Sequence, residues 1–120
     1  MSHILVDLDA TLAEYPSNFP EIGPPIPRMV RRVKYWLAEG KEVRIFTARV
    51  GNSGRRSKHG VDDDSFAADQ RAKIEAWCER HIGRKLVVTA TKTFETIEIW
   101  DDRSVQVRAN TGIRADGIDD

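Results

Sequence analysis

The sequence predicts an α/β fold, in which a mainly parallel sheet lies between two layers of helices in a three-layer α/β/α arrangement. Short apolar runs alternate along the chain with stretches whose apolar residues recur at helical spacing. This alternation favours parallel strands joined by right-handed crossovers. Three of the four apolar runs end in polar residues that can carry chemistry. Because ligands bind at the carboxyl ends of strands in such sheets, we expect these residues to meet at one edge.

Four strands are predicted, because a short apolar run that stops at polar residues is typical of a strand buried on both faces. The runs cover residues 4–6, 43–46, 86–88 and 96–100. The polar residues that follow the first, second and fourth runs are Asp7 with Asp9, Thr47, and Asp101 with Asp102.

Two helices are predicted between these strands. In the first, apolar residues recur at positions 29, 30, 33, 36 and 37. Pro27 suits its first turn and Gly40 its end. The second helix takes Asp64 or Ser65 as its cap and closes at Gly83.

The remaining segments are predicted as loops. Residues 13–27 hold all five prolines, and residues 50–64 form a long connection. Residues 103–109 suit either a helical turn or a short strand, and the polar tail from about residue 113 is expected to be loose.

Composition predicts a single cytoplasmic domain spanning residues 1–120. Lys+Arg and Asp+Glu both number 19, so the net charge of zero gives no global attraction to nucleic acid or to acidic membranes. The single cysteine, Cys78, excludes an internal disulfide and fits a reducing compartment. No apolar run is long enough to span a bilayer, and the first residues lack the plan of a signal peptide.

Four carboxylates gathered at one sheet edge predict a cation site. Asp7, Asp9, Asp101 and Asp102 would repel one another unless a cation neutralised them. Oxygen donors without a Cys/His cluster favour Mg²⁺. A threonine hydroxyl and a lysine ammonium nearby could hold an anion against the metal, and a phosphoryl group fits this description.

These residues resemble a known family. The segment from Asp7 to Leu12 resembles the DxDxT motif of the haloacid-dehalogenase (HAD) superfamily of aspartate-nucleophile phosphatases. Ile45-Phe46-Thr47 is similar to its second motif, Lys92 to its third-motif lysine, and the segment from Ile99 to Arg103 to its acidic fourth motif. The order matches across residues 4–103. The resemblance implies a Rossmann-like domain with strand order 3-2-1-4 and without a cap domain.

The resemblance also implies roles for the residues. Asp7 would be the nucleophile that forms an aspartyl-phosphate, and Asp9 the general acid and then the base. Mg²⁺ would be held by the Asp7 carboxylate, the Asp9 backbone carbonyl and the acidic pair, with Asp102 preferred over Asp101 as the direct ligand. The phosphoryl oxygens would be bound by Thr47 and the Ala48 amide, with Lys92 neutralising their charge. Ala10 stands where glycine is common, which is tolerated if the backbone needs no positive φ.

The loop after Thr47 is basic. Arg49, Arg55, Arg56 and Lys58 could recognise a substrate phosphate or a nucleic-acid backbone. A solvated loop explains them equally well, because three aspartates at positions 62–64 follow. The basic loop together with the Asp-Asp-Arg ending loosely resembles the phosphatase half of polynucleotide kinase-phosphatases.

The function expected is therefore Mg²⁺-dependent hydrolysis of a phosphorylated small molecule or nucleotide. The alternatives are a nucleic-acid end phosphatase or 5′-nucleotidase and, outside the enzymes, a phospho-accepting signalling domain or a silent phosphate-binding domain. No membrane partner is expected, and the oligomeric state stays open.

Overall fold

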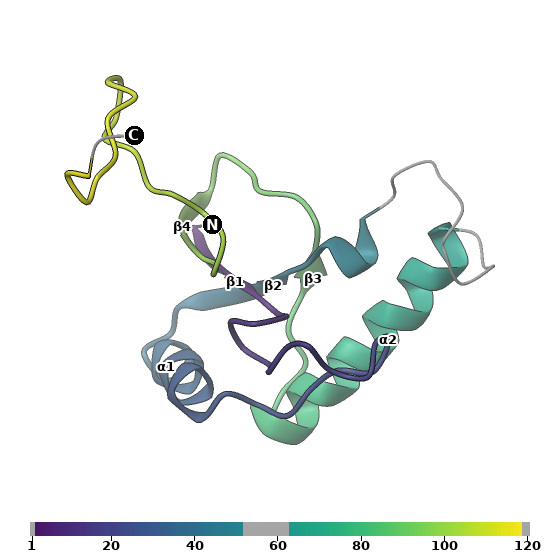
Figure 1. Cartoon of the computed structure of the whole chain (residues 1–120). Helices are drawn as coiled ribbons and strands as arrows, with labels where there is room; N and C mark the ends of the chain where they lie inside the picture. Colours follow the sequence, from purple (N-terminus) through teal and green to yellow (C-terminus); the bar gives the residue numbers. More distant parts are fainter. Residues whose placement is uncertain (1, 52–62, 119–120) are drawn as a thin grey trace.

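The computed structural model describes residues 2–51 and 63–118 (Figure 1). The elements along the chain are β1 (His3–Asp7), α1 (Pro27–Ala38), β2 (Glu42–Phe46), the 3₁₀ turn η1 (Ala48–Val50), α2 (Asp63–His81), β3 (Val88–Thr89) and β4 (Thr96–Trp100). The predicted strands and helices are therefore present, with ends that shift by one or two residues.

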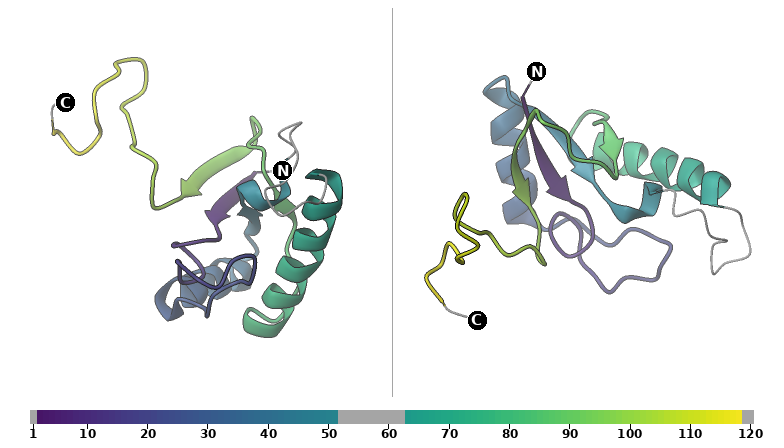
Figure 2. Two further views of the ribbon diagram at one scale, coloured as in Figure 1. Left: turned by 45° about the vertical axis from the view of Figure 1, so that its right-hand side comes forward. Right: turned by 90° about the horizontal axis from the view of Figure 1, so that it is seen from above.

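The four strands form a parallel sheet in the order β3-β2-β1-β4, as predicted. Strand β1 lies between β2 and β4, and Val6 pairs with Ile45 on one side and with Trp100 on the other. The strands run in the same direction, so the carboxyl ends of β1, β2 and β4 share one edge of the sheet (Figure 2).

Both helices lie on the same face of the sheet, where the sequence predicted a layer on each face (Figure 1). Residues of α1, α2 and the alternating positions Ile4 and Val6 of β1 belong to one buried cluster. The two right-handed crossovers step in the same direction, from β1 to β2 and from β2 to β3, which places both helices on one side. The return to β4 is made by residues 90–95, which contain no helix, so the described residues form two layers.

The core forms where the apolar faces of α1 and α2 pack against the sheet. On α1, Pro27 occupies the first turn and Trp36 packs edge-on against Trp100 of β4, with ring centres 5.1 Å apart. On α2, Ile74 and Cys78 are fully buried. Burial also raises the pKa of the Cys78 thiol to about 12, so this cysteine behaves as a packed apolar side chain.

After β4 the chain leaves the body of the molecule (Figures 1 and 2). Of the two structures predicted for residues 103–109, the helical turn is absent. An isolated antiparallel bridge joins Val107 to Arg114 instead, with hydrogen bonds from the Arg108 amide to the Ile113 carbonyl (2.8 Å) and from the Ala115 amide to the Gln106 carbonyl (2.8 Å). Among the described residues, no helix has the length and apolar character needed to cross a membrane.

Two isoleucine-to-alanine substitutions should show that a core side chain contributes more to the free energy of unfolding than an exposed one. Ile74→Ala removes a fully buried side chain and should lower the free energy of unfolding by about 2–5 kcal/mol. Ile97 is 62% exposed, so Ile97→Ala should change it by less than about 1 kcal/mol. Chemical denaturation followed by circular dichroism measures both, and equal losses would contradict this assignment of the core.

Candidate functional site

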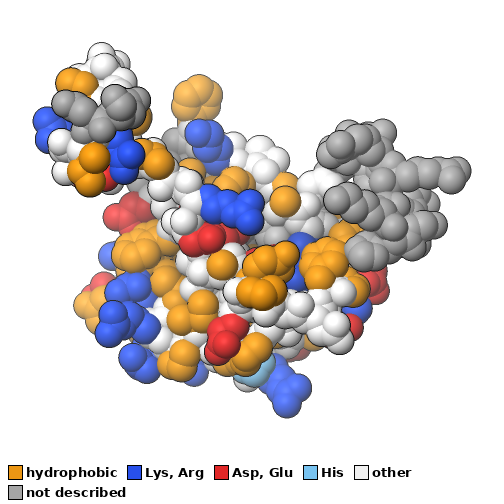
Figure 3. All heavy atoms as spheres, viewed as in Figure 1, with side chains coloured by type: hydrophobic (Ala, Val, Ile, Leu, Met, Phe, Trp, Pro, Cys, Tyr) orange, Lys and Arg blue, Asp and Glu red, His pale blue; other side chains and the backbone are white. Residues whose placement is uncertain are grey.

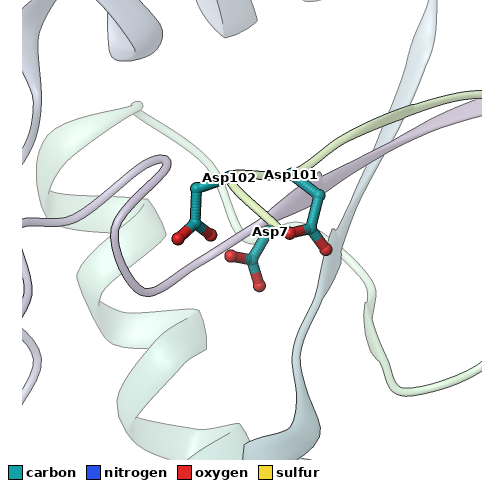
Figure 4. Close-up of side chains that lie close together, drawn as sticks. All are labelled: Asp7, Asp101 and Asp102. Carbon is teal, nitrogen blue, oxygen red and sulfur yellow. The ribbon is translucent and has the colours of Figure 1, made fainter. Parts of the chain in front are cut away.

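Three carboxylates meet at the carboxyl edge of the sheet (Figure 4). Asp7 ends β1, while Asp101 and Asp102 follow β4. Val6 pairs with Trp100, so the residues that follow them, Asp7 and Asp101, are neighbours at the carboxyl edge of the sheet. One oxygen from each of the three carboxylates lies within 4.8 Å of the others, which is a group that can hold a metal ion.

The crowding changes the chemistry of Asp7. Burial, the charge of Asp101, and the hydrogen bond and charge of Asp102 together raise the pKa of Asp7 to about 7. The Thr11 hydroxyl acts in the opposite direction from 3.4 Å away, and it lies at the same distance from Asp102. A single hydroxyl hydrogen cannot compensate three carboxylates. The donor set, made of oxygens and short of positive charge, therefore suits a hard divalent cation.

The fourth predicted carboxylate, Asp9, is turned away from this group. Its two oxygens accept hydrogen bonds from Nε and Nη2 of Arg49, both at 2.8 Å. Asp9 still lines the same pocket as Asp7. The Asp9 side chain thus belongs to an ion pair at the wall of the pocket and is not one of the three clustered carboxylates.

Arg49, which the sequence predicted as a substrate contact, lines the pocket, and its guanidinium is hydrogen-bonded within the protein. Nη1 donates to the Pro20 carbonyl (2.6 Å) and to Oε1 of Gln70 (2.7 Å), and Nη2 donates to the Glu21 carbonyl (3.3 Å). Together with the two bonds to Asp9, these contacts use all five guanidinium N–H groups. Arg49 is 6% exposed and Gln70 is fully buried, so Arg49 joins segments of the protein.

Thr47 and Ala48 lie where the sequence predicted, at the end of β2 and in the pocket that Asp7 lines. The Thr47 amide donates to the Thr89 carbonyl at 2.9 Å, and Thr47 Oγ1 accepts from the Arg49 amide at 3.1 Å. Among the described residues, no acceptor is assigned to the Thr47 hydroxyl hydrogen, which leaves it able to donate into the pocket.

The predicted lysine lies elsewhere. Lys92 is exposed on the connection between β3 and β4, and it lines a neighbouring groove with β4 and residues 104–106. Asp101 lines both this groove and the pocket of Asp7. Ala90 and Arg103 reach the pocket of Asp7 instead. The short, helix-free connection carries Lys92 away from the carboxyl edge. Arg55, Arg56 and Lys58 lie outside the described residues.

The turn after β1 shapes the pocket floor. Ala10 has a φ of 70°. Alanine was expected to be tolerated here only if the backbone needed no positive φ, so this alanine is strained. Its amide donates to the Ala13 carbonyl at 2.8 Å, which closes the turn. Further along, Gly23 approaches the backbone so closely that an added Cβ would lie 2.1 Å from the Glu14 carbonyl oxygen. Trp77 of α2 donates to the Gly23 carbonyl at 3.1 Å and anchors this loop.

Four aromatic side chains complete the pocket, which has a volume of about 550 Å³. They are Tyr15, Phe19, Phe46 and Phe66. Acidic side chains and hydrophobic side chains are exposed beside one another on this side of the molecule (Figure 3). The sequence alone assigned no role to these aromatic residues or to Thr11, Gln70 and Arg103, although Thr11, Phe46 and Arg103 lie inside the motifs that resemble the HAD superfamily. The one available signal was an aromatic pair in the proline-rich loop directly after the first motif.

Comparison with known proteins supports the fold alone. No protein-family model and no characterised protein sequence matches the chain significantly. The chain is similar to a solved structure described as a conserved protein coded by a locus from Bacteroides thetaiotaomicron. The two share 20% identity, with a TM-score of 0.53, over 98% of this chain and 81% of the other.

The pKa of Asp7 predicts how pH affects the stability of the metal-free protein. Between the ordinary value of 3.8 and about 7, the folded protein holds a proton that the unfolded chain has lost. The free energy of unfolding should therefore fall as pH rises through this window. Asp7→Asn should remove that part of the fall and raise Tm at pH 8 by about 4 °C, or roughly 1 kcal/mol after allowance for solvent screening at this half-buried carboxyl.

Calorimetry between pH 4 and pH 8 with a chelator measures this effect. Asp116→Asn, on the segment beyond β4, provides the control. The pKa of Asp116 is lowered by its bond with Arg114, so this variant should keep the shape of the parental profile between pH 5 and pH 8. Superimposable pH profiles for the parent and Asp7→Asn would contradict the proposed electrostatic strain.

The contacts of Arg49 predict that its guanidinium, and not its charge alone, stabilises the fold. Arg49→Lys keeps the charge but loses the fork that reaches Asp9, Pro20 and Gln70. Urea denaturation should show a loss of about 3 kcal/mol or more. The matched change Arg44→Lys alters a more exposed pair with Glu42 and should cost less than about 1 kcal/mol. A similar cost for both would assign Arg49 no special role.

Proposed function

We propose that this protein is a Mg²⁺-dependent phosphatase that hydrolyses phosphomonoesters through a covalent intermediate on Asp7. The observation that carries the proposal is the group of three carboxylates, from the ends of β1 and β4, in the pocket that Thr47 and Ala48 also line. Such a group needs a cation, and a threonine hydroxyl with a backbone amide beside it suits a phosphoryl group. The order of the motifs along the chain supports the same chemistry.

In the first step, the Asp7 carboxylate attacks phosphorus and the bond to the leaving oxygen breaks. The Thr47 hydroxyl and the Ala48 amide donate to the non-bridging oxygens and keep the phosphoryl group in line with the nucleophile. Asp7, Asp101 and Asp102 would hold Mg²⁺, which supplies positive charge against the carboxylates and the phosphoryl oxygens. A neutralised cluster also keeps Asp7 ionised, as a nucleophile must be.

Asp9 would serve the two steps unequally. Both of its oxygens accept hydrogen bonds from Arg49, so one of these bonds must open before Asp9 can carry a proton to the leaving oxygen. In the second step, when water attacks the aspartyl-phosphate, Asp9 acts directly as a carboxylate base. The ion pair therefore favours the base role over the acid role.

A nucleic-acid end remains the second candidate substrate. No inserted cap domain interrupts the chain between the motifs, and the sequence that follows Thr47 is rich in basic residues. The proposed contacts of Arg55, Arg56 and Lys58 with such a polyanion fall in the part of the chain that the structure does not describe. Loss of salt dependence in a triple alanine variant of these residues would distinguish polyanion recognition from a solvated loop.

Phosphate release from 4-nitrophenyl phosphate, with Mg²⁺ and with a chelator, tests the function. Asp7→Asn should reduce turnover to the uncatalysed background, because an amide is a poor nucleophile. Asp9→Asn should lower it by about 10²- to 10⁴-fold and allow the aspartyl-phosphate to accumulate, since this leaving group needs little protonation.

Asp116→Asn, which lies outside the pocket, is the matched control and should keep the parental rate. Mass spectrometry of the quenched protein detects the covalent intermediate. Turnover that resists the chelator, or an Asp7→Asn variant at the parental rate, would refute the proposal.

A further inference from the structure

We propose that the pocket selects monophosphate esters whose leaving group carries a planar heteroaromatic ring, with Tyr15 and Phe19 as its stacking surface. A nucleoside monophosphate is the simplest ligand of this class. The inference rests on the proposed function, which places the phosphate at the carboxylate group. It adds a proposal for how the pocket recognises the rest of the substrate, which does not react.

The pocket is built for a ligand larger than a phosphate group. Its volume of about 550 Å³ falls within the range of roughly 300–1,000 Å³ in which small-molecule ligands bind. Four aromatic rings account for much of the lining. The charged residues of the lining are Asp7, Asp9, Arg49, Asp101, Asp102 and Arg103, and Thr47 and Ala48 lie beside them. A ligand that fits both parts has a phosphate and a flat apolar surface.

Two of these rings are exposed in spite of being well anchored. Tyr15 is 49% exposed and Phe19 is 41% exposed, although both belong to a loop whose backbone is tied down on either side. The Glu14 amide donates to the Pro24 carbonyl at 2.9 Å, and the Glu21 amide donates to the Asn18 carbonyl at 2.9 Å. An exposed aromatic surface on an ordered loop is a ready contact for a ligand, because little side-chain freedom is lost on binding.

Arg49 orients the second ring. Its Cζ lies 4.8 Å from the centre of the Phe19 ring, and its Nη1 binds the carbonyl of the following residue, Pro20. The Phe66 ring of α2 lies 6.1 Å from the Phe19 ring, centre to centre. Arg49 is thus a positioning residue that connects the aromatic surface to Asp9, and the ring and the proposed chemistry share one rigid support.

The aromatic part of the lining favours a flat ring over further sugar hydroxyls at the end of the ligand that does not react. A sugar presents hydroxyl groups in several directions, and each hydroxyl that loses water needs a hydrogen-bond partner. Phenylalanine rings offer none, whereas a nucleobase presents a π-face that stacks on them without directional hydrogen bonds. Recognition of the ring should therefore discriminate strongly between two esters with the same phosphate.

Adenosine 5′-monophosphate and ribose 5-phosphate provide the matched pair, since both carry the phosphate on the same primary carbon and differ in the base. With Mg²⁺, the kcat/KM of the parent protein should be about tenfold or more higher for the nucleotide. Phe19→Leu keeps the bulk but removes the aromatic face, and it should lower this ratio about three- to tenfold through the KM of the nucleotide. Phe94→Leu makes the same change at an exposed ring of the other groove and should leave the ratio unchanged.

Calorimetric titration of the Asp7→Asn variant with both ligands, in Mg²⁺, separates ring recognition from catalysis. Equal affinities and equal kcat/KM values would overturn the inference and leave the phosphatase function standing. A tighter nucleotide complex without hydrolysis of any ester would uphold ring recognition and refute the proposed function. If neither ligand binds and no ester is hydrolysed, both are overturned.

Discussion

The guanidinium of Arg49 holds the carboxyl edge of this protein together. It carries a buried positive charge, which is stable only because the paired carboxylate of Asp9 and three further acceptors use every N–H group. These acceptors belong to the turn after β1, the proline-rich loop and α2. The direction of the Asp9 carboxylate and the position of the Phe19 ring therefore depend on one interaction, and so does the shape of the pocket between them.

The carboxylate cluster is a second constraint, and it opposes stability. Strand order places β4 directly beside β1, so the acids that end these strands cannot avoid one another. Burial first, and then the charges of Asp101 and Asp102, raise the pKa of Asp7. Three carboxylates at this position cost stability when no cation is bound, and they form a group that can hold a metal ion. The electrostatic strain at Asp7 and the proposed chemistry are thus two consequences of the same arrangement.

The layering of the fold leaves the pocket accessible. Both helices cover one face of the sheet, and the return to β4 takes a short path without a helix. The chain after β4 then projects from the body instead of folding over the carboxyl edge (Figure 1). Within the described residues, the proline-rich loop contributes Tyr15 and Phe19 to the wall of the pocket, together with Phe66 of α2 and Arg103.

The sequence by itself determined the α/β class, the strand order and the meeting of Asp7 with Asp101 and Asp102. The α/β class follows from short-range patterns, which hold in any chain of this kind. The strand order, which places Asp101 and Asp102 beside Asp7, was predicted only from the resemblance of the motifs to a known family. Tertiary structure alone decided that Arg49 faces Asp9, 40 residues away, and that Lys92 lies in a different groove. It also decided the positive φ of Ala10. Such contacts depend on the path of loops, whose irregular backbones carry no periodic signal in the sequence. They also depend on burial, because a buried charged side chain is stable only when it is paired and hydrogen-bonded.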